Sequence, residues 1–317
     1  MMRRLEELDR LDRVASSPEE VLWPVGRSSR NDPRAWQPGP RDRAASTKWW
    51  ERHPAIGFIV VALIIGGWLA GPRVPEWVDR MFPARPALAV GEERPEPPEG
   101  STSRILPPVV VSGVPPSTTF DFMVTQNGSA EPVTFDPCRP IRFVVRDALG
   151  AGPRGREAVT RAVAAVSAAS GLSFEDAGDT DEAPARDRAL YQPDRYGESW
   201  APVLIAWSNP AEEPELAGRT AGLGGGRPLR DTHGRMTYVS GTVWLDTPSL
   251  APDLTTPEGF IRVQAVIMHE LSHVLGAGHV QDSRELMAEE NSGRTDFGIG
   301  DRYALSQLGR GACVPGL

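Results

Sequence analysis

The chain lacks an excess of positive charge. Its 317 residues carry 42 Asp and Glu against 34 Lys and Arg, a formal net charge of −8. Nucleic-acid binding depends on neutralising phosphates with basic side chains, so we expect no nucleic-acid partner. Residues 1–54 hold 11 Lys and Arg against 9 Asp and Glu, which leaves a net charge of about −10 on the remainder. This acidic remainder weakly favours basic substrates.

Charged side chains are absent between residues 55 and 72. Within this stretch, Pro54 to Ala70 forms a largely apolar run that, at ~1.5 Å per residue, just reaches the lower limit for a membrane span. Trp49, Trp50 and Trp68 flank or end it, as interfacial anchors do. A soluble buried helix and a cleaved signal peptide are the alternatives, but the segment preceding the run is too long for a signal peptide. We therefore predict one transmembrane helix at 54–70.

More basic residues precede the predicted span than follow it, so the positive-inside rule places the N-terminus in the cytoplasm. We therefore expect a single-pass protein of the cell membrane whose C-terminal domain is extracytoplasmic. Residues 1–53 form a polar tail that we predict to be disordered. Residues 71–117 are rich in Pro and Glu and are typical of an extended stalk. The globular domain is predicted at 118–317, a length that suffices for one sizeable core.

Histidine is scarce, and three of the five histidines lie in the stretch from His269 to His279. On a helix, His269 and His273 are one turn apart on the same face and can bind one metal ion. Gly276 can take a positive φ, which lets the chain leave the helix and bring His279 back as a third ligand. Three protein nitrogens leave one position of a tetrahedral zinc site open to water. Glu270, on the same turn, can accept a proton from a zinc-bound water whose pKa is lowered to about 7.

The stretch matches the signature H-E-x-x-H-x-x-G-x-x-H, and the sequence resembles metzincin zinc metalloendopeptidases, closest to their matrixin-like branch. The resemblance implies a catalytic zinc and a Met-turn, for which Met287 is the candidate; an ordinary core methionine is the alternative. Asp301 resembles the N-cap of the family's C-terminal helix. Matrixins can be kept latent by a Pro-Arg-Cys-Gly motif, which this chain lacks, so latency of that kind has no support.

The resemblance implies an α+β metzincin-like domain: a mixed twisted sheet, an active-site helix and a small C-terminal subdomain after Gly278. The hydrophobic pattern agrees with this order of elements. Strands are expected at 140–146, 172–175, 203–207 and 236–246, and helices at 155–170 and 257–277. In the family an edge strand binds the substrate backbone in extended form. Our candidate lies within the last strand and comprises Val239, Ser240, Gly241, Thr242 and Val243.

The chain contains two cysteines, Cys138 and Cys313, which bracket the predicted domain. Outside the cytoplasm a disulfide between them is the expected outcome and would stabilise the fold by roughly 2–4 kcal/mol. The alternative is that the Cys138 thiolate binds and blocks the zinc in a latent form. Its neighbours Pro137 and Arg139 differ from the inhibitory motif, which favours the disulfide.

Three other features admit weaker interpretations. The resemblance implies calcium sites near Asp176, Asp179, Asp181 and Glu182, but their spacing matches no calcium-binding pattern and favours a solvated acidic loop. Gly222–Gly226 lacks the Lys-Ser/Thr of a phosphate-binding loop and is interpreted as a flexible rim loop. His233 is either part of a second metal site or a surface histidine, and the surface position is favoured.

We therefore predict a membrane-anchored zinc endopeptidase that cleaves proteins or peptides outside the cytoplasm. The histidines hold zinc and Glu270 acts as general base. Two alternatives stay open: a catalytically silent zinc-containing surface protein that binds or scaffolds partners, and a hydrolase of non-peptide amides. The sequence does not determine the substrate or the oligomeric state.

Overall fold

The computed structural model describes residues 94–95, 102–127, 129–290 and 292–317. The predicted cytoplasmic tail and transmembrane helix lie outside these residues. Within them, no helix has the length and apolar character needed to cross a membrane.

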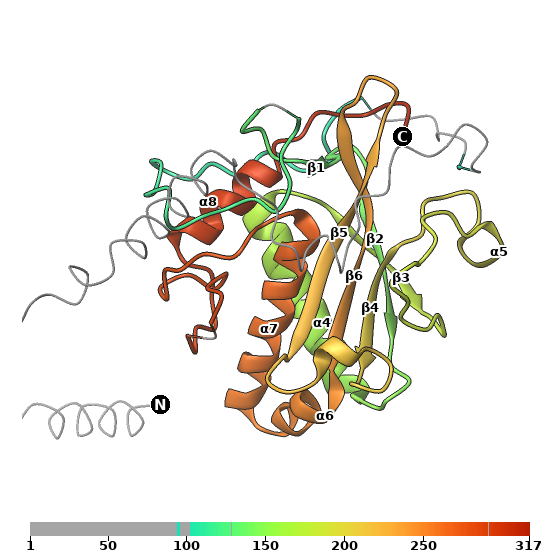
Figure 1. The fold of residues 1–317 in the computed structure, drawn as a ribbon, viewed down its shortest axis with the longest axis vertical. Helices are drawn as coiled ribbons and strands as arrows, with labels where there is room; N and C mark the ends of the chain where they lie inside the picture. Colours follow the sequence, from blue (N-terminus) through green and yellow to red (C-terminus); the bar gives the residue numbers. More distant parts are fainter. Residues whose placement is uncertain (1–93, 96–101, 128, 291) are drawn as a thin grey trace, which may run out of the picture. The chain divides into compact units, whose positions relative to one another are not determined.

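A mixed sheet forms the centre of the domain (Figure 1). Its strands are β1 (Thr134–Phe135), β2 (Ile141–Arg146), β3 (Phe174–Asp179), β4 (Val203–Ser208), β5 (Gly222–Arg230) and β6 (Met236–Asp246). In space β3, β2, β4 and β6 lie next to one another in parallel, β1 pairs in parallel with the first part of β6, and β5 pairs antiparallel with β6. The sheet is therefore mixed, as predicted, and largely parallel.

Two long helices pack against one face of the sheet and against each other (Figure 1). They are α4 (Gly152–Ser170) and α7 (Pro257–Leu275), close to the predicted helices. The core between them and the sheet consists mainly of aliphatic side chains, with small residues such as Ala158 and Ala162 on α4 that allow close approach. The remaining helices are short: α5 (Pro193–Tyr196), η2 (Pro214–Leu216), α6 (Thr247–Leu250), η3 (Ala251–Thr255) and α8 (Ile299–Leu308).

On the opposite face of the sheet, Tyr196 of α5, between β3 and β4, and Leu216 of η2 pack against buried side chains of the strands. The sequence pattern predicts a solvated acidic loop at 176–200. That prediction needs correction, because residues 176–179 belong to β3 and Glu182 is buried. The four acidic residues considered for calcium each accept hydrogen bonds from an arginine: Asp176 and Asp179 from Arg156, Asp181 from Arg195, and Glu182 from Arg188. Their charges are thus compensated by guanidinium groups, and the calcium interpretation gains no support.

The glycine cluster predicted to be a loop is instead the start of β5. A Cβ atom on Gly224 would lie 2.2 Å from the carbonyl oxygen of Glu270, and one on Gly226 would lie 2.4 Å from that of Val274. Only glycine lets the strand approach the helix backbone this closely. Alternate glycines of β5 therefore form the surface on which α7 packs.

The segment from Arg104 to Thr125, which we call the N-terminal segment, is attached to the domain. The Arg104 guanidinium donates to the carbonyl of Gly171 at 3.4 Å, and the amide of Ile105 donates to the carbonyl of Pro137 at 3.1 Å. The predicted stalk, 71–117, therefore extends too far along the chain, because its last part is bound to the domain.

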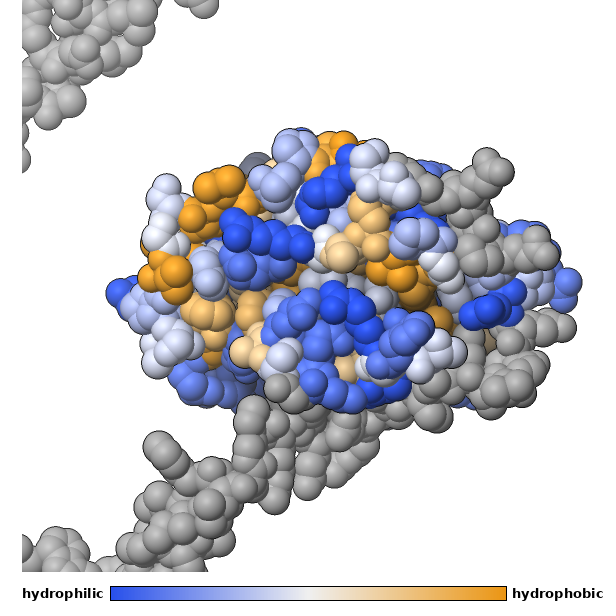
Figure 2. Space-filling model, turned by 90° about the horizontal axis from the view of Figure 1, so that it is seen from above, coloured by the Kyte–Doolittle hydropathy of each residue, from blue (hydrophilic) through white to orange (hydrophobic). Residues whose placement is uncertain are grey.

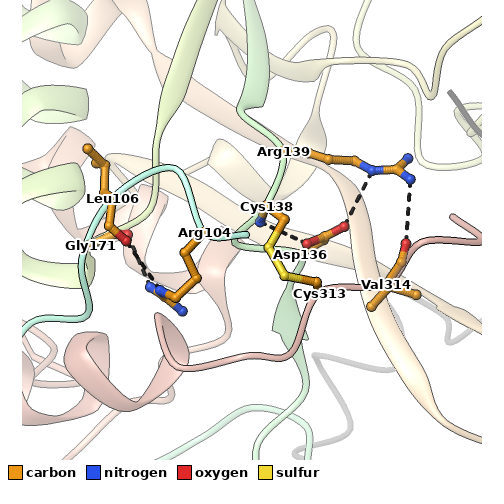
Figure 3. The surroundings of a disulfide bond; sticks show 8 residues. All are labelled: Arg104, Leu106, Asp136, Cys138, Arg139, Gly171, Cys313 and Val314. Carbon is orange, nitrogen blue, oxygen red and sulfur yellow. Dashed lines mark hydrogen bonds and ion pairs between the residues drawn. A yellow bond between two sulfur atoms is a disulfide. The ribbon is translucent and has the colours of Figure 1, made fainter. Parts of the chain in front are cut away.

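Cys138 and Cys313 form a disulfide, as the sequence favours (Figure 3). Their Cα atoms are 5.4 Å apart, within the usual range for disulfides. Asp136 accepts a hydrogen bond from the amide of Cys138, and Arg139 contacts Asp136 and the carbonyl of Val314 (Figure 3). The bond ties the start of β2 to the end of the described chain. It also excludes Cys138 as a thiolate ligand in this state.

Seen from above, the upper end of the domain is largely hydrophilic, and hydrophobic side chains form separate patches between polar ones (Figure 2). His233 is exposed in the turn between β5 and β6, where its amide donates to Asp231 at 2.8 Å. This exposed position agrees with a surface histidine.

Candidate metal centre

Helix α7 carries the first two histidines and has clear sequence signals at both ends. Thr256 is the N-cap, and its hydroxyl accepts a hydrogen bond from the amide of Gly259 at 3.0 Å; Pro257 comes next, in the first turn. The helix ends at Gly276, whose φ of 110° lies in the left-handed region. A Cβ there would also lie 3.0 Å from the ring of Tyr238. Glycine is therefore required both by the backbone conformation and by the space available.

The chain then turns back and brings His279 to the other two histidines. The N-terminal segment supports this turn: the amide of Met123 donates to the carbonyl of Gly276 at 2.8 Å, and the amide of Gly278 donates to the carbonyl of Asp121 at 2.9 Å. The position of the third histidine thus depends on residues more than a hundred positions earlier in the sequence.

The three imidazoles converge through their Nε2 atoms. Nε2 of His269 lies 3.1 Å from that of His273, and Nε2 of His279 lies 3.0 Å from each of them. The Nδ1 atoms of His269 and His273 lie 2.8 Å from the carbonyls of Leu286 and Ala277. Because a carbonyl oxygen only accepts, both Nδ1 atoms carry the proton.

In neutral His269 and His273, Nε2 therefore presents a lone pair toward the other ring. Two lone pairs at this distance repel each other unless a cation lies between them. Zinc-binding histidines are also commonly oriented by a carbonyl that accepts from Nδ1, as found here. Burial lowers the pKa of all three imidazoles, that of His279 to about 4, which keeps them neutral near pH 7. The residues present thus fit a zinc ion held by three nitrogens.

Glu270 lies beside this centre and is buried, with 7% of its surface exposed. A Cβ on Gly222 would lie 2.8 Å from Cγ of Glu270, so the glutamate side chain passes directly under β5. Burial raises the pKa of Glu270 to about 8. A cation bound by the neighbouring histidines would lower this pKa. The group is therefore suited to exchanging a proton near neutral pH.

Met287 is buried in the turn that follows the third histidine. The same turn supports His269, because the carbonyl of Leu286 contacts Nδ1 of that histidine. The carboxylate of Asp301 accepts hydrogen bonds from the amides of Leu286 and Met287 at 2.5 and 3.2 Å. Glu285 in turn accepts from the amides of Gly300 and Asp301. The turn is therefore fastened to the start of α8. The N-cap of α8 is Gly298 rather than Asp301, which is the third helical residue and accepts from the Gly298 amide at 2.8 Å.

A cleft of about 520 Å³ opens over the three histidines and Glu270. It is lined by the start of β5 and, after the third histidine, by Leu286, Ala288, Glu289, Gly293 and Arg294. Its volume is that of an ordinary ligand-binding pocket.

The proposed substrate strand needs correction. Val239–Val243 lies in β6, which is paired on both sides, with β5 on one and with β4 and β1 on the other. These residues cannot add another strand. Among the described strands β5 is the one at this edge of the sheet, and Gly222–Gly224 borders the cleft. The edge strand next to the centre is therefore the glycine-rich β5.

Comparison with known proteins gives limited information. Neither a family model nor a curated protein matches the sequence. Among solved structures, archaemetzincin from Methanopyrus kandleri aligns over 53% of this chain and 95% of its own, with 16% identity and a TM-score of 0.34. The GM1-bound form of the ECX AB5 holotoxin aligns over 53% of this chain and 64% of its own, with 13% identity and a TM-score of 0.28. Similarity this low carries no argument about activity, so the function must be argued from the centre itself.

Sequence reasoning missed three parts of this centre: the role of β5, the support from the N-terminal segment, and the carboxyl pair Glu285–Asp301. Only the first had a readable signal. Glycine at every second position, 222, 224 and 226, matches the period of a strand with one face pressed against another backbone.

Proposed function

We propose that this protein is a zinc-dependent endopeptidase of the metzincin type, closest to the matrixin-like branch. One observation carries the proposal: three histidine Nε2 atoms lie 3.0–3.1 Å from one another beside a buried glutamate. This donor set leaves a coordination position open, as catalytic zinc sites do, whereas structural zinc sites are closed by four protein ligands.

A zinc ion held by His269, His273 and His279 would act as a Lewis acid toward the scissile carbonyl and would lower the pKa of water. Glu270 then accepts a proton from the attacking water at its carboxylate and passes it to the leaving amine. The carbonyls of Leu286 and Ala277 keep two imidazoles in the tautomer that exposes Nε2 to the metal.

The peptide would lie extended along the edge of β5. Main-chain hydrogen bonds to an edge strand align a substrate with little dependence on its side chains, which suits an endopeptidase. The start of β5 passes directly over Glu270, so a peptide added to this edge would have its backbone near the general base.

A disulfide between Cys138 and Cys313 favours an oxidising compartment for the domain. Together with the apolar run at 54–70, this supports our proposal of a membrane-anchored protein with an extracytoplasmic catalytic domain. Labelling of Cys138 and Cys313 in intact cells by a thiol reagent, without prior reduction, would argue against this location.

The proposal is tested by zinc content and cleavage of a degenerate peptide library, using the full chain and its Glu270→Gln variant. We expect one zinc per chain in both and a loss of cleavage of about 1000-fold or more in the variant, because the general base is removed. Glu258→Gln is the matched control, since this glutamate lies exposed in the first turn of the same helix.

A Glu270→Gln variant that cleaves at the wild-type rate would refute the assignment of the base. Zinc binding without cleavage by the wild-type chain would favour the catalytically silent binding protein. Cleavage of amides other than peptides would favour the hydrolase of non-peptide amides.

A further inference from the structure

Arginines gather around the cleft of this acidic protein. Arg219, Arg262 and Arg294 all line it, against the single glutamate Glu289 besides Glu270. They come from three separate parts of the chain: the residues before β5, the first half of α7, and the loop before α8. The local charge of the cleft is thus opposite to the net charge of −8 of the whole chain. A charge lining a cleft acts on a ligand far more than charges elsewhere on the surface.

Two of these arginines lie at the same end of the cleft. Alternate glycines of β5 meet Glu270 and then Val274, so β5 and α7 run in the same direction. Arg219 precedes β5 and therefore lies toward the N-terminal half of α7, which also carries Arg262. Between them the cleft is lined by apolar Ala265 and Val266.

Their interactions leave these guanidinium groups accessible. Arg219 is exposed and makes no hydrogen bond or ion pair with the residues that the structure describes. Arg262 pairs with the exposed Asp253 at 3.1 Å, a surface contact of the kind that contributes little and exchanges readily. An unpaired arginine is commonly a solvated surface group. Arg219, however, lies near a second arginine at the cleft, where both guanidinium groups can bind an anionic group of a ligand.

We propose that the cleft selects peptides with an acidic side chain about three residues from the scissile bond, bound by Arg219 and Arg262. Arg262 precedes His269 by two helical turns, or ~10 Å along α7, which an extended peptide covers with about three residues. This inference rests on the proposed function, whose substrate it specifies. It also reverses the preference for basic substrates expected from composition, because net charge does not report the charge of one cleft.

The test uses two degenerate peptide libraries that differ only in carrying glutamate or glutamine at the fixed positions three residues to either side of the centre. Binding is measured to the zinc-loaded full chain carrying Glu270→Gln, which prevents turnover. We expect the glutamate library to bind about tenfold more tightly at low ionic strength, and this advantage to shrink as salt is added.

Adding Arg219→Gln or Arg262→Gln is expected to reduce the advantage of glutamate about threefold each. Arg235→Gln is the matched control, because this exposed arginine lies in the turn between β5 and β6 and does not line the cleft. Equal binding of both libraries would overturn the inference, as would an Arg235→Gln effect as large as that of the cleft variants.

Cleavage of both libraries by the wild-type chain separates this inference from the proposed function. Preferential binding of glutamate without any cleavage would refute the endopeptidase and leave the acidic ligand. Cleavage of both libraries at equal rates, unaffected by the cleft substitutions, would retain the endopeptidase and refute its acidic specificity.

Discussion

Helices α4 and α7 invite direct comparison. Both have 19 residues, both carry proline in the first turn, both end at a left-handed glycine, and they pack side by side on the same face of the sheet (Figure 1). The buried face of α4 consists mainly of Ala and Val, together with Gly155 and Ser170. That of α7 also contains Glu270, Ser272 and His273. The one polar side chain that α4 buries, Ser170, donates to the carbonyl of Val166 in the same helix. Helix α7 also buries a glutamate and a histidine, ionisable groups that cost free energy unless they find partners.

The two terminal glycines show how the same local device serves different purposes. Gly171, with a φ of 71°, leads α4 into β3. Gly276 redirects the chain so that His279 meets the two histidines of α7. The helix of the candidate metal centre thus differs from its neighbour by a few polar residues and by the path that the chain takes after the cap.

The largest effect is expected where α7 meets the sheet. A Cβ at Gly224 would collide with backbone atoms of Glu270, the nearest at 2.2 Å, whereas one at Gly155 of α4 would meet side chains of Ala151 and Trp207 at 2.6 and 3.0 Å. We expect Gly224→Ala to lower the free energy of unfolding by about 3 kcal/mol, since backbone cannot move aside. For Gly155→Ala, a gain in helix propensity of about 1 kcal/mol offsets much of the crowding. Urea denaturation measures both, and equal losses would contradict the comparison.

Zinc removal is expected to act on α7 and to spare α4. At free zinc about 100 times above Kd, binding stabilises the folded chain by about 2.7 kcal/mol, which a chelator removes. Hydrogen exchange should then quicken at His273 to Ala277, where α7 ends, with little change in α4. A thermal midpoint that does not respond to chelation and zinc restoration would count against the metal centre.

Substitution of the two cap glycines separates stability from function. Gly171→Ala and Gly276→Ala both force alanine into positive φ and a crowded site, and each is expected to cost about 2 kcal/mol. Only Gly276→Ala should also weaken zinc binding, by about tenfold or more, because it shifts His279. Zinc affinity measured by competition with a chelating dye distinguishes them, and equal affinities would show that the turn does not position the third ligand.

The smallest effect concerns the carboxyl pair that supports the turn after the histidines. Burial raises the pKa values of Glu285 and Asp301, and repulsion by the Asp301 carboxylate raises that of Glu285 further. Above the unfolded carboxyl pKa of about 4, the folded state then holds more protons than the unfolded state, so stability falls as the pH rises through the raised pKa. In Glu285→Gln the side-chain amide can donate a hydrogen bond to Asp301 at every pH, because an amide does not titrate.

We expect this variant to gain about 1 kcal/mol relative to the wild type between pH 4 and pH 8, measured by urea denaturation at both pH values. Asp301→Asn is the matched control: it removes one acceptor oxygen from a carboxylate that binds three backbone amides and should destabilise at pH 8. A parallel pH dependence of wild type and Glu285→Gln would contradict the assignment.

The sequence predicts best those features that depend on neighbours along the chain. The long helices and their periodic apolar faces, the histidine pair one turn apart and the glycine turn after it all arise from local geometry. Predictions fail where distant segments meet. The pattern predicts a loop at Gly222–Gly226 because glycine is disfavoured in strands. In the fold these residues form a strand, and the close contact with α7 requires glycine in it. The resemblance places Asp301 at the helix cap, although its carboxylate fastens a turn fifteen residues earlier.

The sequence by itself determined the set of candidate site residues: three histidines that can hold a metal and a glutamate that can act as base, with a spacing set by one helix and one turn. The tertiary structure decided the rest, namely that β5 rather than β6 is the edge strand, that the N-terminal segment supports the third histidine, and that arginines from three separate segments line one cleft. These depend on strand pairing and on contacts between residues far apart in the sequence, and no local pattern in the chain encodes them.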